Sequence, residues 1–433
     1  MNNQPAPADK VAVALSGGGV RAFLFGLGAL RAVIRAREQR GFNLSALVAV
    51  SGGAIVAAFA TSRVDLSSAT LADYDEKVLR PAFKTITSRS LMFGAPYLWI
   101  VIVIAASCIS APTGIAIFLP CLTFWARTLL PVGGVVLAMF VVGVRGWAIE
   151  RAMAAVLFKG DVPLTSVDGG TRLILQTSDL TSGEATYFTS SGVESYRWGK
   201  APADKVSLVH AARAAATFPG VFPPFRMTGL RFGGGAEKKV PKTIQVVDGG
   251  VYDNMASEWL LNEKRTSAAV YKVVINASRN LTERPGNFGI PVLGDVKAFL
   301  REHDIQYDAT TAPRRRWLID LFKARAQRGT LVAIDGRPAA WPRSFLGAGD
   351  DRAARAAALL QQIENAKAEE TWKRWHTNNP AYATSLGRVP RDKAMDLVCA
   401  GYFATALQTH ILDGWPEPET CNPTELMSWL QSD

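Results

Sequence analysis

The sequence predicts an α/β fold with a mostly parallel central sheet, because two strand–turn–helix units follow one another near its start. The apolar run Val11–Leu15 leads through a glycine turn into the apolar helical stretch Phe23–Ile34. A second apolar run, Ala46–Val50, leads through another glycine turn into the alanine-rich stretch Ala54–Ala58. Strands that alternate with helices form parallel sheets covered on both faces. We therefore expect a three-layer sandwich.

Later segments add strands first and helices afterwards. Two apolar runs flank a Thr181–Glu184 turn within Thr171–Phe188, and Ile244–Val247 reads as another strand. After about residue 280 the chain becomes helical and basic, with apolar residues at helical spacing. The expected helices are Asp295–Tyr307, Arg314–Arg328, Asp350–Trp375 and Asp392–Leu412. We expect residues 291–433 to form a helical region packed on the α/β domain.

A long apolar insertion interrupts the α/β pattern. No charged residue lies between Arg89 and Arg127 or between Arg127 and Arg145. The segment Tyr97–Phe124 is long enough for a spanning helix, which needs about 20 apolar residues, and Leu129–Val144 is only just long enough. The insertion therefore predicts a transmembrane hairpin over residues 91–145. A hairpin buried in an oligomer and one lying in a single leaflet are the alternatives.

A hairpin returns the chain to the side from which it left, so residues 1–90 and 146–290 can form one discontinuous domain. Basic residues flank the outer ends of the hairpin, whereas Arg127 is expected in the tight connection between its helices. The flanking set is Lys84, Arg89, Arg145, Arg151 and Lys159. By the positive-inside rule, the domain is expected on the cytoplasmic side of a multi-pass inner-membrane protein.

Three glycine-containing strings carry the candidate chemistry. Ser51 follows the end of an apolar run and precedes two glycines. This is the strand-to-helix turn typical of a nucleophile elbow. Asp248 follows Ile244–Val247 and precedes two glycines, where a strand ends. The loop Gly17–Gly19 precedes a helix, and its N–H groups with the helix N-terminus suit a negatively charged oxygen. These are the parts of a serine hydrolase site.

A serine hydroxyl needs a base to take its proton. The chain has four histidines, His210, His303, His376 and His410. Their surroundings are typical of structural roles, which favours Asp248 as the base. An aspartate with an ordinary pKa of about 3.9 is a weak base, so we expect Asp248 to be enclosed and its pKa raised by desolvation. The similar string at Asp168 precedes an apolar run and is typical of a plain turn.

The order and spacing of these strings resemble those of the bacterial type of patatin-like phospholipases, over Lys10 to about residue 90 and 146 to about 280. The resemblance implies a patatin-like sandwich with oxyanion donors on a glycine loop, a nucleophile in G-x-S-x-G and a base in D-G-G/A. It assigns the oxyanion hole to Gly17, Gly18 and Gly19, and a Ser/Asp dyad to Ser51 and Asp248.

Two positions depart from the family pattern. In the nucleophile elbow, Gly53 is retained but Ala49 stands where the family has its first glycine, and Ala22 stands where the glycine loop usually closes with glycine. Each adds one methyl group, so we expect slight distortion and not loss of the site. Arg21, one turn into the following helix, either holds the loop or meets a lipid phosphate. Nucleotide binding is disfavoured because the loop lacks the phosphate-binding glycine patterns.

The resemblance implies a lipid acyl hydrolase of phospholipase or lysophospholipase type, and the apolar insertion adds a membrane anchor. In this scheme Ser51 attacks a fatty-acyl ester, Asp248 accepts and returns the proton, and water hydrolyses an acyl-serine. The scheme requires neither a metal nor an organic cofactor. The rival is a membrane scaffold or ligand-responsive sensor that keeps the fold with a weakened site, for which Ala49 and Ala22 are the sequence support.

The charge balance suits an anionic lipid surface. The chain carries a formal net charge of +11 at pH 7, and 48% of its residues are hydrophobic. With an apolar hairpin, phospholipid or another acyl lipid is the expected partner. No nucleic-acid motif is recognisable, so nucleic acid is not expected. Homo-oligomerisation stays open, and four cysteines without a C-x-x-C pair fit a reducing compartment.

Overall fold

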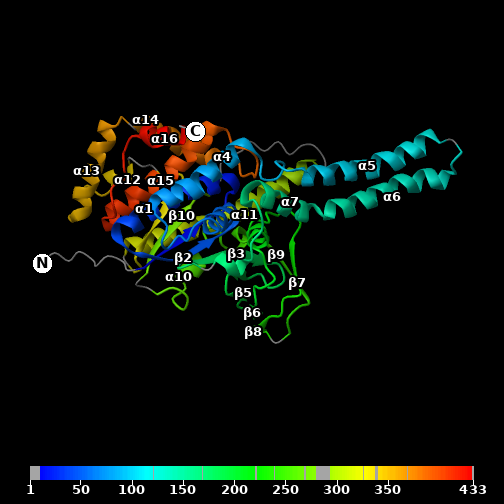
Figure 1. Ribbon diagram of the computed structural model, residues 1–433, viewed down its shortest axis with the longest axis horizontal. Helices are drawn as coiled ribbons and strands as arrows, with labels where there is room; N and C mark the ends of the chain where they lie inside the picture. Colours follow the sequence, from blue (N-terminus) through cyan, green and yellow to red (C-terminus); the bar gives the residue numbers. More distant parts are fainter. Residues whose placement is uncertain are drawn as a thin grey trace.

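The computed structural model describes residues 10–431 except residues 120, 168, 220–221, 238, 268–269, 279–292, 325, 337–339 and 368. Within those limits the chain forms a layered α/β body from which one helical hairpin projects (Figure 1). Both candidate strings, at Ser51 and at Asp248, lie in the body.

An 11-stranded mixed sheet forms the middle layer of the described chain. Its path runs β11-β10-β1-β2-β3-β4-β5-β6-β8, and β9 pairs with both β3 and β7. The strands are β1 (Lys10–Leu15), β2 (Asn43–Ala49), β3 (Arg172–Asp179), β4 (Ala185–Thr189), β5 (Gly192–Ser195), β6 (Gly199–Ala201), β7 (Phe225–Thr228), β8 (Gly233–Gly234), β9 (Thr243–Asp248), β10 (Tyr271–Asn276) and β11 (Gly329–Ala333).

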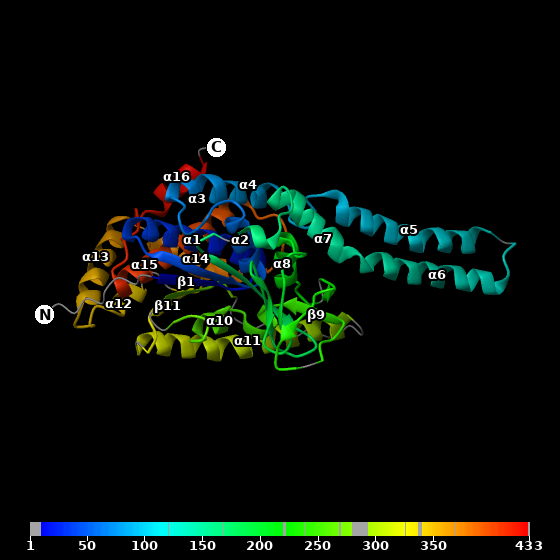
Figure 2. The ribbon, with the colours of Figure 1, turned by 60° about the horizontal axis from the view of Figure 1, so that its bottom comes forward.

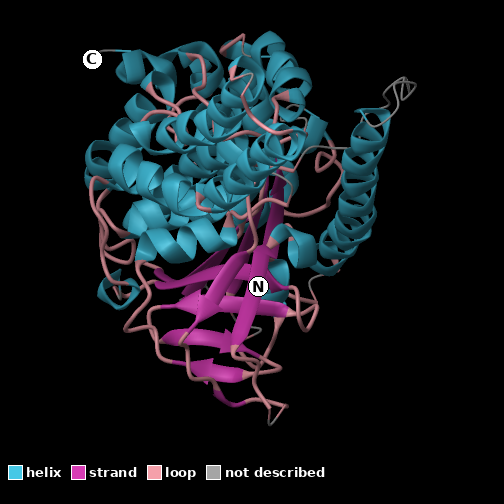
Figure 3. Cartoon of the chain, turned by 90° about the vertical axis from the view of Figure 1, so that its right-hand side faces the viewer, coloured by secondary structure: helices cyan, strands magenta, loops and turns pink. Residues whose placement is uncertain are grey.

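The expected α/β sandwich is confirmed, and its sheet is parallel in one half. The pairs β11–β10, β10–β1, β1–β2 and β2–β3 are parallel. From β3 onward, and between β9 and its partners, the pairing is antiparallel. The parallel strands are nearly continuous apolar runs because both of their faces are covered. Figure 3 shows the sheet from the side, with helices stacked above it.

Helices cover both faces of the sheet (Figure 2). The larger layer contains α1 (Gly19–Arg40), α2 (Ser51–Thr61), α4 (Arg80–Ser88), α7 (Arg145–Met153), α8 (Leu208–Ala215), α13 (Asp351–Asn365), α14 (Glu369–Ala381), α15 (Arg391–Asp413) and α16 (Pro423–Gln431). The opposite layer contains α10 (Ser257–Leu261) and α11 (Leu293–Lys323). Shorter helices are α3 (Leu71–Tyr74), α9 (Gly250–Asp253) and α12 (Ala340–Arg343).

The alternation of β1 side chains separates two hydrophobic cores. Val11, Val13 and Leu15 join the core beneath α1 and α2, whereas Ala12 and Ala14 join the core above α10 and α11. Successive strand residues point to opposite faces. Strand β1 therefore contributes side chains to both hydrophobic cores of the sandwich.

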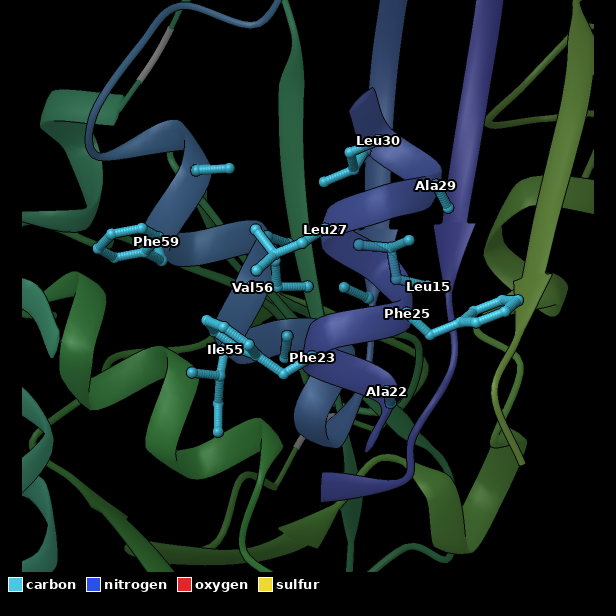
Figure 4. Close-up of a cluster of buried hydrophobic side chains, with 14 of the residues drawn as sticks. Leu15, Ala22, Phe23, Phe25, Leu27, Ala29, Leu30, Ile55, Val56 and Phe59 are labelled. Atoms are coloured by element: carbon cyan, nitrogen blue, oxygen red, sulfur yellow. The ribbon is translucent and has the colours of Figure 1, made fainter. Parts of the chain in front are cut away.

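The helices that follow the two glycine turns pack on each other. Phe23 and Leu27 of α1 lie beside Ile55 and Val56 of α2 (Figure 4). All four side chains are almost completely buried. This contact holds the two glycine turns in a fixed relation at the ends of β1 and β2.

Helix α15, in the C-terminal region, packs closely on α1 because each helix has a glycine at the crossing. A Cβ atom on Gly28 would lie 1.8 Å from the carbonyl oxygen of Val398. A Cβ atom on Gly401 would lie 2.0 Å from the carbonyl oxygen of Phe25. These positions require glycine so that the two backbones can approach. The C-terminal region is therefore built onto the helix that starts at the glycine loop.

The C-terminal region differs from the expected run of helices in three places. The separate helices expected at Asp295–Tyr307 and Arg314–Arg328 are one helix, α11, which continues through Pro313. The chain then forms β11, which extends the sheet beside β10. The helix expected over Asp350–Trp375 is divided into α13 and α14. Sequence periodicity missed β11 because a short edge strand shows little of it.

The apolar insertion forms two antiparallel helices, α5 (Pro96–Phe118) and α6 (Phe124–Gly143), which extend away from the body (Figures 1 and 2). By length and composition both are able to cross a membrane, and 17% of the most apolar window of each is buried. Such low burial distinguishes them from core helices. Helix α5 ends before the expected Phe124. Arg127 lies in the first turn of α6 and not in the connection, and its Nη2 donates to the carbonyl of Leu119 at 3.4 Å.

Candidate active site

Ser51 occupies a strained turn between β2 and α2. Its φ of 52° lies in the left-handed region, which costs a non-glycine residue about 1–3 kcal/mol. The turn is fixed because the Val50 N–H donates to the carbonyl of Leu15 at 3.1 Å. A Cβ atom on Gly53 would lie 2.6 Å from the Ser16 carbonyl oxygen. Strand, turn and helix therefore place Ser51 as expected for a nucleophile elbow, with 8% of the residue exposed.

Ala49 fits in place of the glycine usual in this family's elbow. It is fully buried in the core beneath α1, and it pairs in register with both Leu15 and Leu175. The extra methyl group is thus accommodated at the end of β2 without interrupting either ladder. This agrees with the expectation that the substitution preserves the elbow.

Asp248 approaches Ser51 from the opposite direction. On β3, Leu175 pairs with Ala49 of β2, and Thr177 pairs with Asp248 of β9. Both contacts lie on the side of β3 opposite β4, since Leu175 and Thr177 also pair with β4. The strands β2 and β9 therefore meet end to end along β3. Their carboxyl ends bring Ser51 and Asp248 to the same place.

The carboxylate of Asp248 is enclosed, as expected. The residue is 3% exposed, and its Oδ1 accepts a hydrogen bond from the N–H of Gly250 at 2.8 Å. Burial raises the pKa of Asp248 from 3.8 to about 6, although interactions with the Ser51 hydroxyl and the Gly250 N–H lower it. The second oxygen, Oδ2, has no hydrogen-bond partner of normal geometry among the described residues. Serine and aspartate are thus close but loosely paired, as is common before substrate binds.

The backbone of Asp248 is fixed more firmly than its side chain. Its N–H donates to the carbonyl of Thr217 at 2.9 Å, and its carbonyl accepts from the Ser178 hydroxyl at 2.9 Å. The N–H of Tyr252 donates to the same hydroxyl at 3.0 Å. These bonds hold the turn after β9 against β3, so the carboxylate has a defined position beside Ser51.

Three N–H groups of the glycine loop, those of Gly17, Gly18 and Gly19, were expected to face the oxyanion. The Gly17 N–H already donates to the backbone carbonyl of Asn254 at 3.0 Å and to its Oδ1 at 3.2 Å. The expectation for Gly17 is therefore corrected, because its N–H is engaged by Asn254. Gly18 and Gly19 have φ values of 139° and 59°, which glycine adopts readily. They lie at the N-terminus of α1, where backbone N–H groups favour negative charge.

Arg21 joins the start of α1, just after the glycine loop, to distant backbone carbonyls. The residue is 1% exposed, and its Nε donates to the carbonyl of Ala277 at 2.9 Å. Its Nη1 donates to the carbonyls of Tyr382 at 2.6 Å and Pro380 at 3.5 Å. Of the two expected roles, these bonds support loop stabilisation, because a buried guanidinium bonded to carbonyls is not placed to meet a lipid phosphate.

Two further side chains at the site were missed by sequence reasoning. Asn254 contacts the glycine loop and also donates through Nδ2 to the Ser278 hydroxyl. It lies six residues after Asp248, and its polar character within a turn was the available signal. Tyr307 of α11 brings its hydroxyl between the glycine loop and Gly250. Its position inside an amphipathic helix gave no signal at all.

Two of the described histidine side chains are held in structural contacts. His210 Nδ1 lies 3.0 Å from a carboxylate oxygen of Glu150, and His410 Nδ1 lies 2.6 Å from the carbonyl oxygen of Trp415. The side chain of His303 and residue Asp168 lie outside the described residues. No cluster of three or more His, Cys, Asp or Glu residues suited to a metal occurs in the described ranges.

Comparison with known proteins identifies the class to which this fold and site belong. Residues 13–257 match the family model of patatin-like phospholipases. Because the match covers more than half of the chain, the protein belongs to the patatin-like phospholipase family. Both Ser51 and Asp248 lie within the matched range, whereas Tyr307 lies beyond it.

Among solved structures, the chain is similar to the crystal structure of VipD from Legionella pneumophila. The two chains share 12% sequence identity, and the alignment covers 98% of this chain and 91% of that one, with a TM-score of 0.27. A sequence search of curated proteins returns no match.

Proposed function

We propose that this protein is a membrane-anchored lipid acyl hydrolase that cleaves fatty-acyl esters through a Ser51/Asp248 dyad. Membership of the patatin-like phospholipase family supports lipid ester hydrolysis in general. The observation that carries the finer proposal is the meeting of β2 and β9 along β3, which brings a strained serine beside an enclosed aspartate. Phospholipids and lysophospholipids are the proposed substrates.

In the proposed reaction, the Ser51 hydroxyl attacks the ester carbonyl while Asp248 takes its proton. Gly18 and Gly19 donate N–H hydrogen bonds to the oxyanion, aided by the N-terminus of α1. Collapse of this intermediate breaks the bond to the alcohol, which receives the proton from Asp248. Water then attacks the acyl-serine with Asp248 again as base, releasing the fatty acid.

The raised pKa of Asp248 suits this role. A carboxylate that binds its proton more strongly takes it from serine more readily, and each pKa unit corresponds to about 1.4 kcal/mol. The increase from 3.8 to about 6 makes Asp248 a better base by about 3 kcal/mol. At neutral pH most of the carboxylate still remains ionised. Desolvation thus strengthens the base without keeping it protonated.

The hairpin supplies the proposed membrane anchor. Large apolar side chains lie exposed along it, including Phe118, Phe124, Met139 and Phe140, each at least 70% exposed. Such a surface is unfavourable in water and is stabilised in lipid. The flanking basic residues favour placement of the body on the cytoplasmic side of an inner membrane, against anionic headgroups. Burial of the hairpin in a homo-oligomer is the competing arrangement.

Active-site labelling tests the proposed chemistry. The detergent-solubilised protein should react with a fluorophosphonate probe, and Ser51→Ala should abolish this labelling. The control is Ser88→Ala, at an exposed serine, which should leave the labelling unchanged. Asp248→Asn should reduce both labelling and ester hydrolysis by at least about a hundredfold, since general-base assistance typically contributes that much. Lack of labelling in the folded wild-type protein would favour the scaffold or sensor.

A further inference from the structure

Helix α11 brings Tyr307 to both members of the dyad, although this helix lies beyond the family match. A Cβ atom on Gly17 would lie 3.1 Å from Ser51 Cβ and 3.2 Å from Tyr307 Oη. A Cβ atom on Gly250 would lie 3.0 Å from Tyr307 Oη and 3.1 Å from Asp248 Oδ1. The tyrosine hydroxyl therefore lies near Gly17, beside the serine, and near Gly250, beside the carboxylate.

The hydroxyl of Tyr307 lies on one side of the proposed reaction centre. The carbonyl oxygen of a substrate must face Gly18 and Gly19, whose N–H groups lie at the N-terminus of α1. The alcohol oxygen must face Asp248, because the same carboxyl returns the proton to it. The hydroxyl of Tyr307 lies near Gly250, beside the carboxylate, and near Gly17, whose N–H is engaged by Asn254. Because Gly17 is not available to the oxyanion, we place this hydroxyl on the alcohol side of Ser51.

Tyr307 also lines a cavity. Its volume is about 220 Å³, and it is formed between the end of β10 and one face of α11. The residues that line it include Ser278, Tyr307, Thr311, Arg315, Arg316 and Ile319. The α11 residues recur at helical spacing, as one face of a helix requires. Tyr307 is thus shared by the cavity and the surroundings of the dyad.

We propose that Tyr307 is an additional active-site residue, whose hydroxyl donates a hydrogen bond to the alcohol oxygen of the ester as the alcohol departs into the cavity beneath α11. This inference rests on the proposed function. As Ser51 Oγ bonds to the carbonyl carbon and the carbon–alcohol bond breaks, the proton from Ser51 passes through Asp248 to the alcohol. Tyr307 keeps its own proton throughout.

The surroundings keep the tyrosine in its donor form. Burial and the nearby Asp248 carboxylate raise the pKa of Tyr307 well above 10, while Arg21 lowers it less. The side chain therefore carries its O–H proton across the working pH range. A neutral donor at this position stabilises negative charge that develops on the departing oxygen, and it adds no charge that would compete with Asp248.

Leaving-group dependence tests this role with the full-length protein in detergent. Two esters with the same acyl chain are compared, a simple alkyl ester and a p-nitrophenyl ester, whose phenolate departs without protonation. In Tyr307→Phe, kcat/KM should fall about 10- to 100-fold for the alkyl ester. The p-nitrophenyl ester should lose less than about threefold, because its departing oxygen needs little stabilisation. The exposed Tyr196→Phe is the matched control and should leave both values unchanged.

A second variant tests the cavity. Thr311→Trp fills the space beneath α11 and should lower kcat/KM for a lysophospholipid, while a fatty-acyl methyl ester is cleaved at the wild-type rate. Equal losses for both p-nitrophenyl and alkyl esters in Tyr307→Phe, or no loss, would overturn the role of Tyr307 while leaving the dyad intact. Full activity in Ser51→Ala would instead refute the proposed function itself.

Discussion

Ala49 and Asp248 end two strands that meet along the same side of β3, opposite residues only two positions apart. Ser51 follows Ala49 by two residues and begins α2, so the candidate nucleophile projects into the gap where β9 arrives. Gln176 lies on β3 between the two residues that face these strand ends, and its Nε2 donates to the carbonyls of Gly249 and Asp253. The relation between serine and aspartate is therefore set by backbone pairing.

The pH profile of hydrolysis should report Asp248. Because burial raises its pKa to about 6 and the base must be ionised, kcat/KM should fall about tenfold per pH unit below 6. Above about pH 7 it should be level. The measurement is kcat/KM for a soluble ester from pH 4.5 to 8.5. A profile that stays level down to pH 4.5 would rule out an aspartate with a raised pKa as the base.

The same burial should reduce the stability of the folded protein at neutral pH. The pKa of Asp248 is higher in the folded state than its ordinary 3.8, so the folded state binds more protons between about pH 4 and 6. Stability from this residue is thus present below pH 4 and lost as pH rises through 6, by about 3 kcal/mol. Asp248→Asn should therefore unfold at a higher temperature than wild type at pH 7.5.

That gain should shrink as pH falls to 4.5, where the wild-type carboxyl becomes protonated. Thermal unfolding of the detergent-solubilised protein, followed by circular dichroism at both pH values, measures the difference. An Asp248→Asn variant that is less stable than wild type at pH 7.5 would mean that the carboxylate is better solvated than its burial indicates. Asp161→Asn, at an exposed position, is the matched control.

Arg21 should act through the glycine loop and not through substrate phosphate. Arg21→Met removes the hydrogen bonds to Ala277 and Tyr382, and the buried carbonyls left unpaired should cost about 1–3 kcal/mol each. The variant should show a lower unfolding temperature and a similar loss of kcat/KM for a phospholipid and for an uncharged acylglycerol. Loss confined to the phospholipid would instead support phosphate recognition.

The hairpin should control access to bilayer lipid. Replacement of residues 96–143 by a short polar linker should give a protein that needs no detergent and still cleaves a short-chain soluble ester. Its activity on phospholipid vesicles should fall by at least tenfold, on the order of the affinity lost with an apolar anchor. The intact protein should resist extraction by high salt or carbonate. Equal vesicle activity without the hairpin would show that α5 and α6 serve oligomerisation.

The local sequence contained the parts of the site but not the arrangement that joins them. Glycine after Ser51 and an apolar run before it predict a tight strand-to-helix turn, because few other sequences tolerate the backbone contact seen at Gly53. Charge-free stretches likewise predict the hairpin, since such composition suits lipid. The expected helix end at Phe124 and the expected place of Arg127 in the connection were wrong, because apolar composition continues beyond the helix ends.

Tertiary structure alone decided which backbone and side-chain groups share the site. The antiparallel entry of β9 depends on pairing with β3, about seventy residues earlier, and no local pattern encodes that partner. The engagement of Gly17 by Asn254, the clamp made by Arg21 and the arrival of Tyr307 on α11 likewise depend on contacts between distant segments. Sequence determined the local turns, since these follow from backbone sterics. The fold determined which of these turns and side chains lie together, because desolvation and long-range pairing arise only when the chain is packed.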